Sequence, residues 1–170
     1  MKLALPSMLL ASALVAWAPA ATSADSPDAS FYKHAAQGGL AEVQAGNLAQ
    51  QKSNNPKVKE FAAMMVKDHA AANDKLKALA DSKGIDLPGN SGMGQMANKA
   101  KLEVLSGDVF DKSYIKSQIK AHQNTIVLFK QEINSGRDSD AKAFAKEMLP
   151  TVRSHLKSIK AIAESAGVSM

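Results

Sequence analysis

Apolar residues recur every three or four positions in four long stretches of the chain, which is the spacing of one face of an α-helix. No stretch shows the period-two alternation that is typical of β-strands. The pattern therefore predicts an all-α protein with four long helices, at about residues 27–51, 56–83, 108–134 and 139–166.

The connections between these stretches predict how the helices are arranged. Residues 53–55 form a turn and a cap before Pro56, and so short a link makes the first two helices antiparallel neighbours. Residues 84–106 are too many for a simple hairpin loop. They contain a stretch rich in Gly, Pro, Asn and Ser at 85–94 and a short amphipathic segment at 95–105. We therefore expect a four-helix bundle whose second and third long helices are joined by a long crossover, with a short helix inside it.

Each long helix carries one ionisable residue near the centre of its apolar face: Glu42, His69, His122 and His155. A polar group in that place must find a partner inside the fold, because burying it unpaired is costly. With a rise of about 1.5 Å per residue and a crossover connection, all four fall at one depth of the bundle to within roughly 6 Å. The remaining histidine, His34, lies off the inward face of the first helix, and we expect it to be exposed.

Three imidazoles and a carboxylate are the ligand types that bind zinc, copper or iron. The convergence predicts a site for one Cu or Zn ion at Glu42, His69, His122 and His155. The alternative is a metal-free polar layer, in which the rings donate to Glu42 or to Asp111 and fix the register of the helices. Both interpretations remain open on the sequence. Further candidates for a supporting role near the site are Asp111, Gln118, Met65 and Met148; the two methionines would suit copper, although such residues are more often plain core.

The first 24 residues have the pattern of a cleaved secretory signal peptide, with Lys2, an apolar alanine-rich stretch and small residues before Asp25. We expect a single mature domain at 25–170, periplasmic or secreted, with no transmembrane segment once the signal is removed. Loss of Lys2 lowers the formal net charge from +5 to +4. The lysines are scattered among acidic residues rather than clustered, so we expect no nucleic-acid partner. The sequence has no cysteine and therefore no disulfide.

A set of short motifs in a fixed order covers most of the chain between residues 31 and 156. They are Gly39-Leu40-Ala41-Glu42-Val43, Phe61 through Asp68-His69, Leu105-Ser106-Gly107, Phe110-Asp111 with Tyr114, His122, and Leu149-Pro150 with His155-Leu156. Together they resemble a ferritin-like family of exported bacterial proteins, a domain of unknown function often labelled as candidate outer membrane proteins. The resemblance implies a ferritin-like four-helix bundle with a long crossover, and it brings no established activity.

The metal ligands depart from those of ferritin-like di-iron proteins, which use a Glu from two helices and Glu-x-x-His from the other two. The residues three positions before His69 and His155 are Val66 and Val152 rather than glutamates, and the third long helix offers Gln118 in place of an acid. Ferric centres need the missing oxygen anions. We therefore do not expect a di-iron site.

These observations favour an exported, non-enzymatic helical bundle whose His/Glu core binds one transition-metal ion, with envelope stress as a context for its role. The alternative is a structural or interaction protein of the envelope with a metal-free polar core. A metal-dependent redox enzyme is a third interpretation. Nothing in the sequence identifies a protein partner, and homodimerisation is left open.

Overall fold

The structure is a computed structural model that describes residues 27–169; the predicted signal peptide, 1–24, lies outside the described residues. The described part of the chain is all-α, with five helices and no strand, as the apolar spacing predicted. The helices are α1 (Pro27–Lys52), α2 (Pro56–Ser82), α3 (Met93–Glu103), α4 (Gly107–Ser135) and α5 (Ser139–Ser165).

The ends of the helices follow local sequence signals. The side chain of Asn55 caps α2 by accepting a hydrogen bond from the backbone N–H of Lys57, and Pro56 occupies the first turn, where its missing N–H is not needed. Asp138 caps α5 in the same way by accepting from the N–H groups of Asp140 and Ala141. The short helix α3 begins at 93 rather than 95 and ends at 103 rather than 105.

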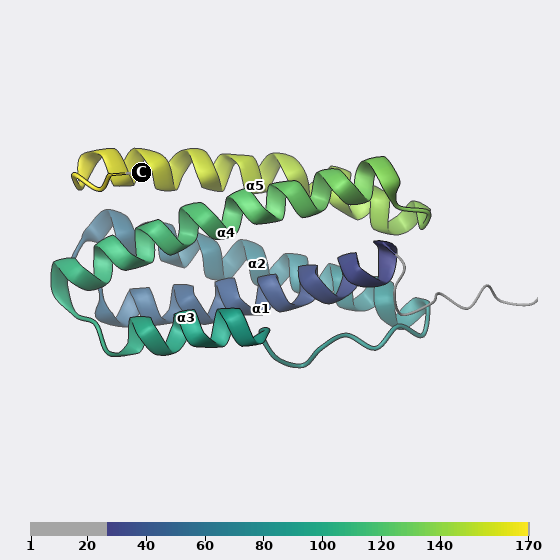
Figure 1. The fold of residues 1–170 in the computed structure, drawn as a ribbon, viewed down its shortest axis with the longest axis horizontal. Helices are drawn as coiled ribbons and strands as arrows, with labels where there is room; N and C mark the ends of the chain where they lie inside the picture. Colours follow the sequence, from purple (N-terminus) through teal and green to yellow (C-terminus); the bar gives the residue numbers. More distant parts are fainter. Residues whose placement is uncertain (1–26, 170) are drawn as a thin grey trace, which may run out of the picture.

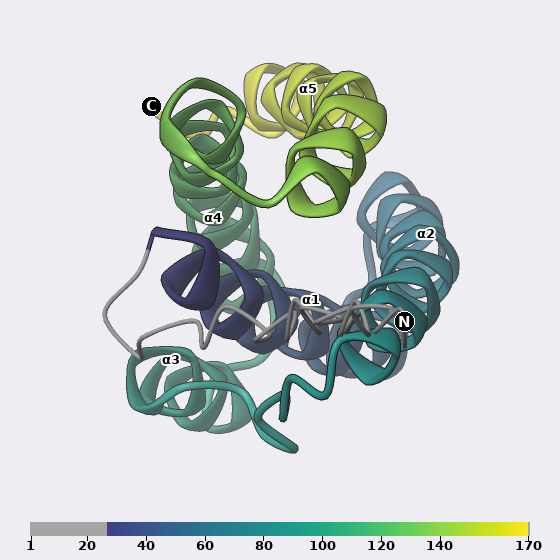
Figure 2. The same cartoon turned by 90° about the vertical axis from the view of Figure 1, so that its right-hand side faces the viewer.

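The four long helices form two antiparallel hairpins, α1–α2 and α4–α5 (Figure 1). From the end of α2 the chain runs back along the bundle, so α4 starts at the end where α1 and α2 are joined, in agreement with the expected crossover (Figure 1). The returning segment contains α3, which packs on the outer side of α1 and also contacts α4 (Figure 2). Antiparallel hairpins and a return connection place the middles of all four long helices at one level.

Helices α1 and α2 approach closely because α1 presents glycines to α2. A Cβ atom on Gly46 would lie 2.8 Å from Val66 Cγ2 and 2.9 Å from the carbonyl oxygen of Ala62. A Cβ atom on Gly39 would overlap the side-chain amide of Asn73. A larger residue at Gly46 would force the two helices apart, whereas one at Gly39 would displace the side chain of Asn73.

The apolar core consists of two clusters at opposite ends of the bundle. One surrounds the α1–α2 turn and the start of α4, and its largest members include Phe61, Met65, Phe110 and Tyr114. The other lies at the α4–α5 turn and includes Phe31, Phe129 and Phe144, whose rings meet edge to face. In every long helix the predicted polar residue falls between the two clusters. A polar layer therefore separates two apolar halves of the core.

Over residues 27–169, no helix combines the length and the hydropathy that crossing a membrane requires.

Candidate metal centre

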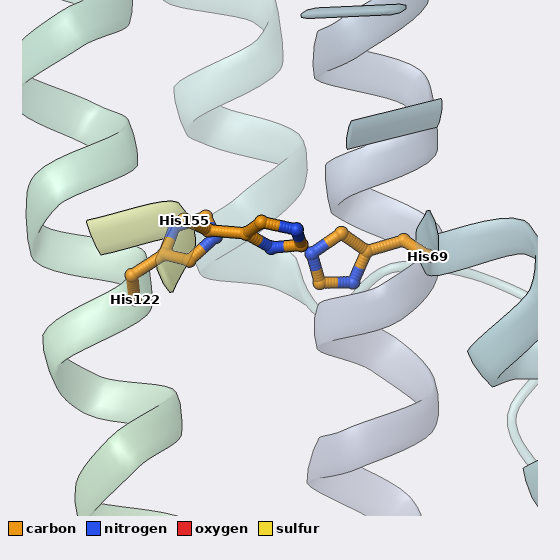
Figure 3. A group of neighbouring side chains, drawn as sticks. All are labelled: His69, His122 and His155. Carbon is orange, nitrogen blue, oxygen red and sulfur yellow. The ribbon is translucent and has the colours of Figure 1, made fainter. Parts of the chain in front are cut away.

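Three histidines from three helices meet in the middle of the bundle (Figure 3). His69 comes from α2, His122 from α4 and His155 from α5, and one ring nitrogen of each lies within 4.8 Å of the others. The ring centroids are 5.5–5.8 Å apart. His122 and His155 are buried and His69 is partly buried. We refer to these residues as the histidine triad.

A backbone carbonyl fixes the orientation of His122. Its Nδ1 lies 2.8 Å from the carbonyl oxygen of Gln118, one turn earlier in α4. A carbonyl can only accept a hydrogen bond, so Nδ1 carries the proton and Nε2 of the neutral ring keeps its lone pair. That Nε2 atom is buried and has no hydrogen-bond partner within the described chain.

A carboxylate fixes the orientation of His155, and here the other ring nitrogen is the donor. Its Nε2 lies 3.0 Å from Asp68 Oδ2, so Nε2 donates and the Nδ1 lone pair is free. The Nδ1 atom of His155 is buried without a partner in residues 27–169, and so is Nε2 of His69. The triad thus supplies three buried nitrogens that no protein donor satisfies, two of them oriented by a second contact. Contacts of this kind orient the ligating imidazoles of protein metal sites.

The spacing of the triad suits one ion after the side chains move inward. Three nitrogen ligands at about 2.0–2.1 Å from one ion in tetrahedral or trigonal geometry lie about 3.3–3.6 Å from one another, so a pair at the observed limit of 4.8 Å would have to close by about 1.2–1.5 Å. Three side chains that each carry two rotatable bonds can make that movement without a change in the helices. The residues present therefore fit a single bound ion.

Burial favours the neutral form of His69 and His155. Burial and repulsion by His122 and His155 lower the pKa of His69 to about 3. Burial also lowers the pKa of His155, although the hydrogen bond from its ring to Asp68 acts in the opposite direction. Metal binding requires neutral imidazole, so the fold holds these two rings in the form that can act as ligands.

Glu42 belongs to the same polar layer but not to the group of three. Its side chain is buried, and its Oε2 atom has no hydrogen-bond partner among the described residues. Burial raises the pKa of Glu42, while the nearby His122 ring and a hydrogen bond with Gln118 lower it in part. The carboxyl group therefore lies beside the triad, next to His122. Its role as a fourth ligand remains a prediction.

This chain matches the model of one protein family. The family model for a domain of unknown function, DUF4142, matches residues 13–162. The chain belongs to the DUF4142 family. A family of unknown function agrees with the resemblance drawn from the sequence motifs, while neither the ferritin-like relationship nor the outer-membrane label is part of the family's description. A search of curated proteins found no significant match.

Several solved structures share the fold of this DUF4142 protein. A DUF305 protein from Streptomyces coelicolor, described as a candidate secreted protein, superposes with a TM-score of 0.73 at 16% identity, covering 86% of this chain and 98% of its own. A DUF305 fragment from Deinococcus radiodurans gives a TM-score of 0.72 at 14% identity, with 82% and 96% covered. CopM in its Cu(II)-bound form gives 0.69 at 17% identity, with 81% and 96% covered. CopM is also represented in Cu(I)-bound and Ag-bound forms. At these identities the likeness shows the fold alone.

The remaining candidates in the DUF4142 chain lie at different distances from the triad. Asp111 is buried on α4, but it precedes His122 by eleven residues, or about 16 Å along the helix, so it lies outside the polar layer. Met65 is part of the apolar cluster near the α1–α2 turn. Met148 lines a cavity that also borders His155. Gln118 serves the layer through its backbone carbonyl and its contact with Glu42.

The sequence analysis missed Asp68. This residue follows directly before His69 in α2, and it orients His155 across the interface with α5. The signal that could have identified it is the Asp-His pair itself. Residues next to each other on a helix point about 100° apart, so an acid beside an inward histidine faces a neighbouring helix.

Proposed function

We propose that this DUF4142 protein binds a single transition-metal ion, copper in preference to zinc, at His69, His122 and His155. Two observations carry the proposal: His69, His122 and His155 each offer a ring nitrogen within 4.8 Å of the others, and each of the three rings has one buried nitrogen without a hydrogen-bond partner in the described chain. Left without a ligand, each buried polar atom costs roughly 1–3 kcal/mol, so a core that only needed packing would be better served by apolar residues. An ion would satisfy all three at once.

The chemistry of the donors favours copper or zinc over iron. Imidazole nitrogen suits copper and zinc, whereas iron centres that activate oxygen rely on carboxylates, and the group of three contains none. Between copper and zinc, the structural likeness to CopM, which is known in Cu(II)-, Cu(I)- and Ag-bound forms, supports copper. A di-iron site is not part of the proposal.

The protein's own residues perform separate tasks at this site. The Gln118 carbonyl and the Asp68 carboxylate hold His122 and His155 in the tautomers that leave one lone pair free. The two apolar clusters border the polar layer on either side. Glu42, beside His122, would compensate part of the positive charge of an ion. No catalytic group or substrate pocket is proposed, and the protein is taken to be non-enzymatic.

A thermal-shift titration tests the proposal. An ion that binds only the folded state stabilises it by about 2.7 kcal/mol when its free concentration is a hundredfold above its Kd, which corresponds to roughly 5–10 °C in Tm for a domain of this size. We expect Cu²⁺ to raise the Tm of the protein from residue 25 onwards, and His69→Ala or His122→Ala to abolish the rise. The control His34→Ala should retain it, because His34 lies outside the triad. Absence of any shift with Cu²⁺ or Zn²⁺ would show that the site does not bind these metals.

The second candidate function is a structural or interaction protein of the envelope with a metal-free polar layer. The position of the layer between two apolar clusters favours it, since a buried polar layer can fix the register of helices. It predicts that the same two alanine variants lose stability in the absence of metal and that no ion changes the wild-type curve. Export to the periplasm or beyond, a ferritin-like ancestry, a role in envelope stress and homodimer formation are further proposals that neither candidate depends on.

A further inference from the structure

The unpartnered ring nitrogens of the histidine triad are buried, so an ion must reach them through the protein. His122 and His155 are 1% and 3% exposed, and His69 is only partly exposed. A cavity of about 60 Å³ borders His69 and His155, and residues of α1 also line it. Two of its lining residues are exposed to solvent, His34 on α1 and Thr151 on α5. Of these two, only His34 carries a nitrogen ligand, so the end of the cavity at α1 is the one that suits an entering ion.

Three of the α1 residues along this cavity follow one another at intervals of four. His34, Gly38 and Glu42 form a single stripe on the helix, with about 6 Å of rise between neighbours. The same three residues also line a larger groove of about 580 Å³ between α1, α3 and α4. The stripe is thus shared by a wide outer groove and a narrow inner cavity that touches the triad.

The two ends of the stripe carry metal-ligating atoms. At the outer end, His34 Nδ1 lies 3.1 Å from Ser30 Oγ, which leaves the Nε2 atom of this exposed ring for another ligand. At the inner end, the buried Glu42 Oε2 atom has no hydrogen-bond partner in the described chain, and Glu42 lies beside His122. A nitrogen donor at the mouth and an oxygen donor at the floor suit stepwise transfer of a divalent ion.

Between them, Gly38 keeps the stripe open. A Cβ atom there would meet no other atom within 4 Å, whereas the next residue, Gly39, packs against Asn73. Glycine is unfavourable inside a helix by about 1 kcal/mol relative to alanine, and at position 38 no close helix contact compensates for it. The free space beside Gly38 is therefore available for an ion to pass between His34 and Glu42.

Resting on the proposed metal site, we propose that the stripe His34–Gly38–Glu42 is the route by which the ion enters and leaves, with His34 as the outer ligand and Glu42 as the inner one. The outer part of the stripe, His34 and Gly38, governs rates rather than affinity. A side chain that fills the passage should slow association and dissociation together, because the triad at its end is unchanged.

Stopped-flow mixing with Cu²⁺, followed by absorbance, tests the route. Gly38→Leu should lower the association rate about tenfold or more and lower dissociation by a similar factor, so that Kd stays within about twofold of wild type. Gly38→Ala is the matched control, since it makes the same backbone change without a side chain long enough to close the passage, and it should bind at the wild-type rate. His34→Ala should slow association while preserving the final metal content.

Thr125→Leu narrows the same passage from α4, because Thr125 lines both hollows, and it provides a second test if Gly38→Leu folds poorly. Unchanged rates in a folded closing variant would overturn the route and leave the triad site intact. The route would also be overturned if a closing variant bound Cu²⁺ with lower affinity while its dissociation rate stayed at the wild-type value. The stripe would then be part of the binding site rather than a passage to it. Failure of the wild-type protein to bind Cu²⁺ or Zn²⁺ would remove the proposed function itself.

Discussion

A buried carboxyl group far from the triad provides a quantitative test of the structure. Glu132 on α4 is 2% exposed, and neither of its oxygens accepts a hydrogen bond from a donor in the described chain. The adjacent polar group is the carboxylate of Asp28, which accepts hydrogen bonds from the N–H groups of Arg137 at 2.7 Å and Asp138 at 2.9 Å. Two carboxylates cannot hydrogen-bond to each other, so the pair requires a proton on one of them.

The proton resides on Glu132. Burial, a hydrogen bond with Asp28 and the negative charge of Asp28 raise the pKa of Glu132 to about 7 from a usual 4.5. Burial acts in the same direction on Asp28, but the hydrogen bonds from Asp138 and Arg137 outweigh it and lower the pKa of Asp28. At about 1.4 kcal/mol per pKa unit, ionising Glu132 in the folded state costs up to about 3 kcal/mol.

The sign of the pH dependence follows from the raised pKa. The folded state binds the Glu132 proton more tightly than the unfolded state, so the stabilising contribution is complete below about pH 4.5 and is lost as the pH rises through about 7. Glu132→Gln replaces the protonated acid with a carboxamide that can donate to Asp28 at any pH. We expect the variant to match wild type near pH 5 and to exceed its unfolding free energy at pH 8 by up to about 3 kcal/mol.

Urea unfolding at pH 5 and pH 8, with a chelator present so that the histidine triad carries no metal, measures this difference. Glu147→Gln is the matched control, because Glu147 on α5 is exposed and pairs only with Lys75 at the surface. Its effect should be small and the same at both pH values. A Glu132→Gln variant whose stability relative to wild type does not change between pH 5 and pH 8 would refute the reasoning.

Four further predictions concern the site and the chain around it. Asp68→Asn should weaken Cu²⁺ binding about 10–100-fold without unfolding the protein, as measured by competition with a chelator, because His155 loses its orienting carboxylate. The metal-free protein should lose stability as the pH falls from about 6.5 toward 3, because unfolding lets His69, whose pKa is about 3 in the fold, take up a proton; circular dichroism melts at graded pH check this. Intact-mass measurement of the exported form should give a chain that begins at Asp25, and a retained Met1 would contradict it. Limited trypsin should cut first at Lys83 or Lys99, in or beside the crossover, and a first cut within α2 or α5 would contradict the predicted order of local opening.

Helical periodicity was sufficient to predict the fold and the convergence of the triad. The spacing of apolar residues defines the inward face, and the rise per residue defines depth, so His69, His122 and His155 could be placed at one level before any contact was known. The crossover was predictable because 84–106 is too long for a turn. The length of α3 was predicted correctly, but its start was shifted by two residues, since Gly92 rather than a residue nearer 95 precedes the first turn.

Side-chain contacts between neighbouring helices were harder to predict from the sequence. Periodicity says that Glu42 faces inward, but whether its carboxyl joins the triad or lies beside His122 depends on side-chain rotamers and on how closely α1 approaches, which glycines at 39 and 46 control. The proximity of Asp28 to Glu132 depends on how the start of α1 meets the α4–α5 turn, and no periodic pattern encodes that meeting.

The two hairpins contribute unequally to the triad, and this has a consequence for how an ion would be held. Packing is most extensive within α1–α2 and within α4–α5, and far smaller between α2 and α5. His122 and His155 both belong to the α4–α5 hairpin and would supply two nitrogens to an ion, whereas His69 would supply the third from the α1–α2 hairpin. The effective concentration of the His69 nitrogen at the ion would therefore depend on how firmly the two hairpins pack together, rather than on the length of the crossover. Binding of an ion and packing of α2 against α5 would then be coupled. The bound ion would link the two hairpins of the bundle.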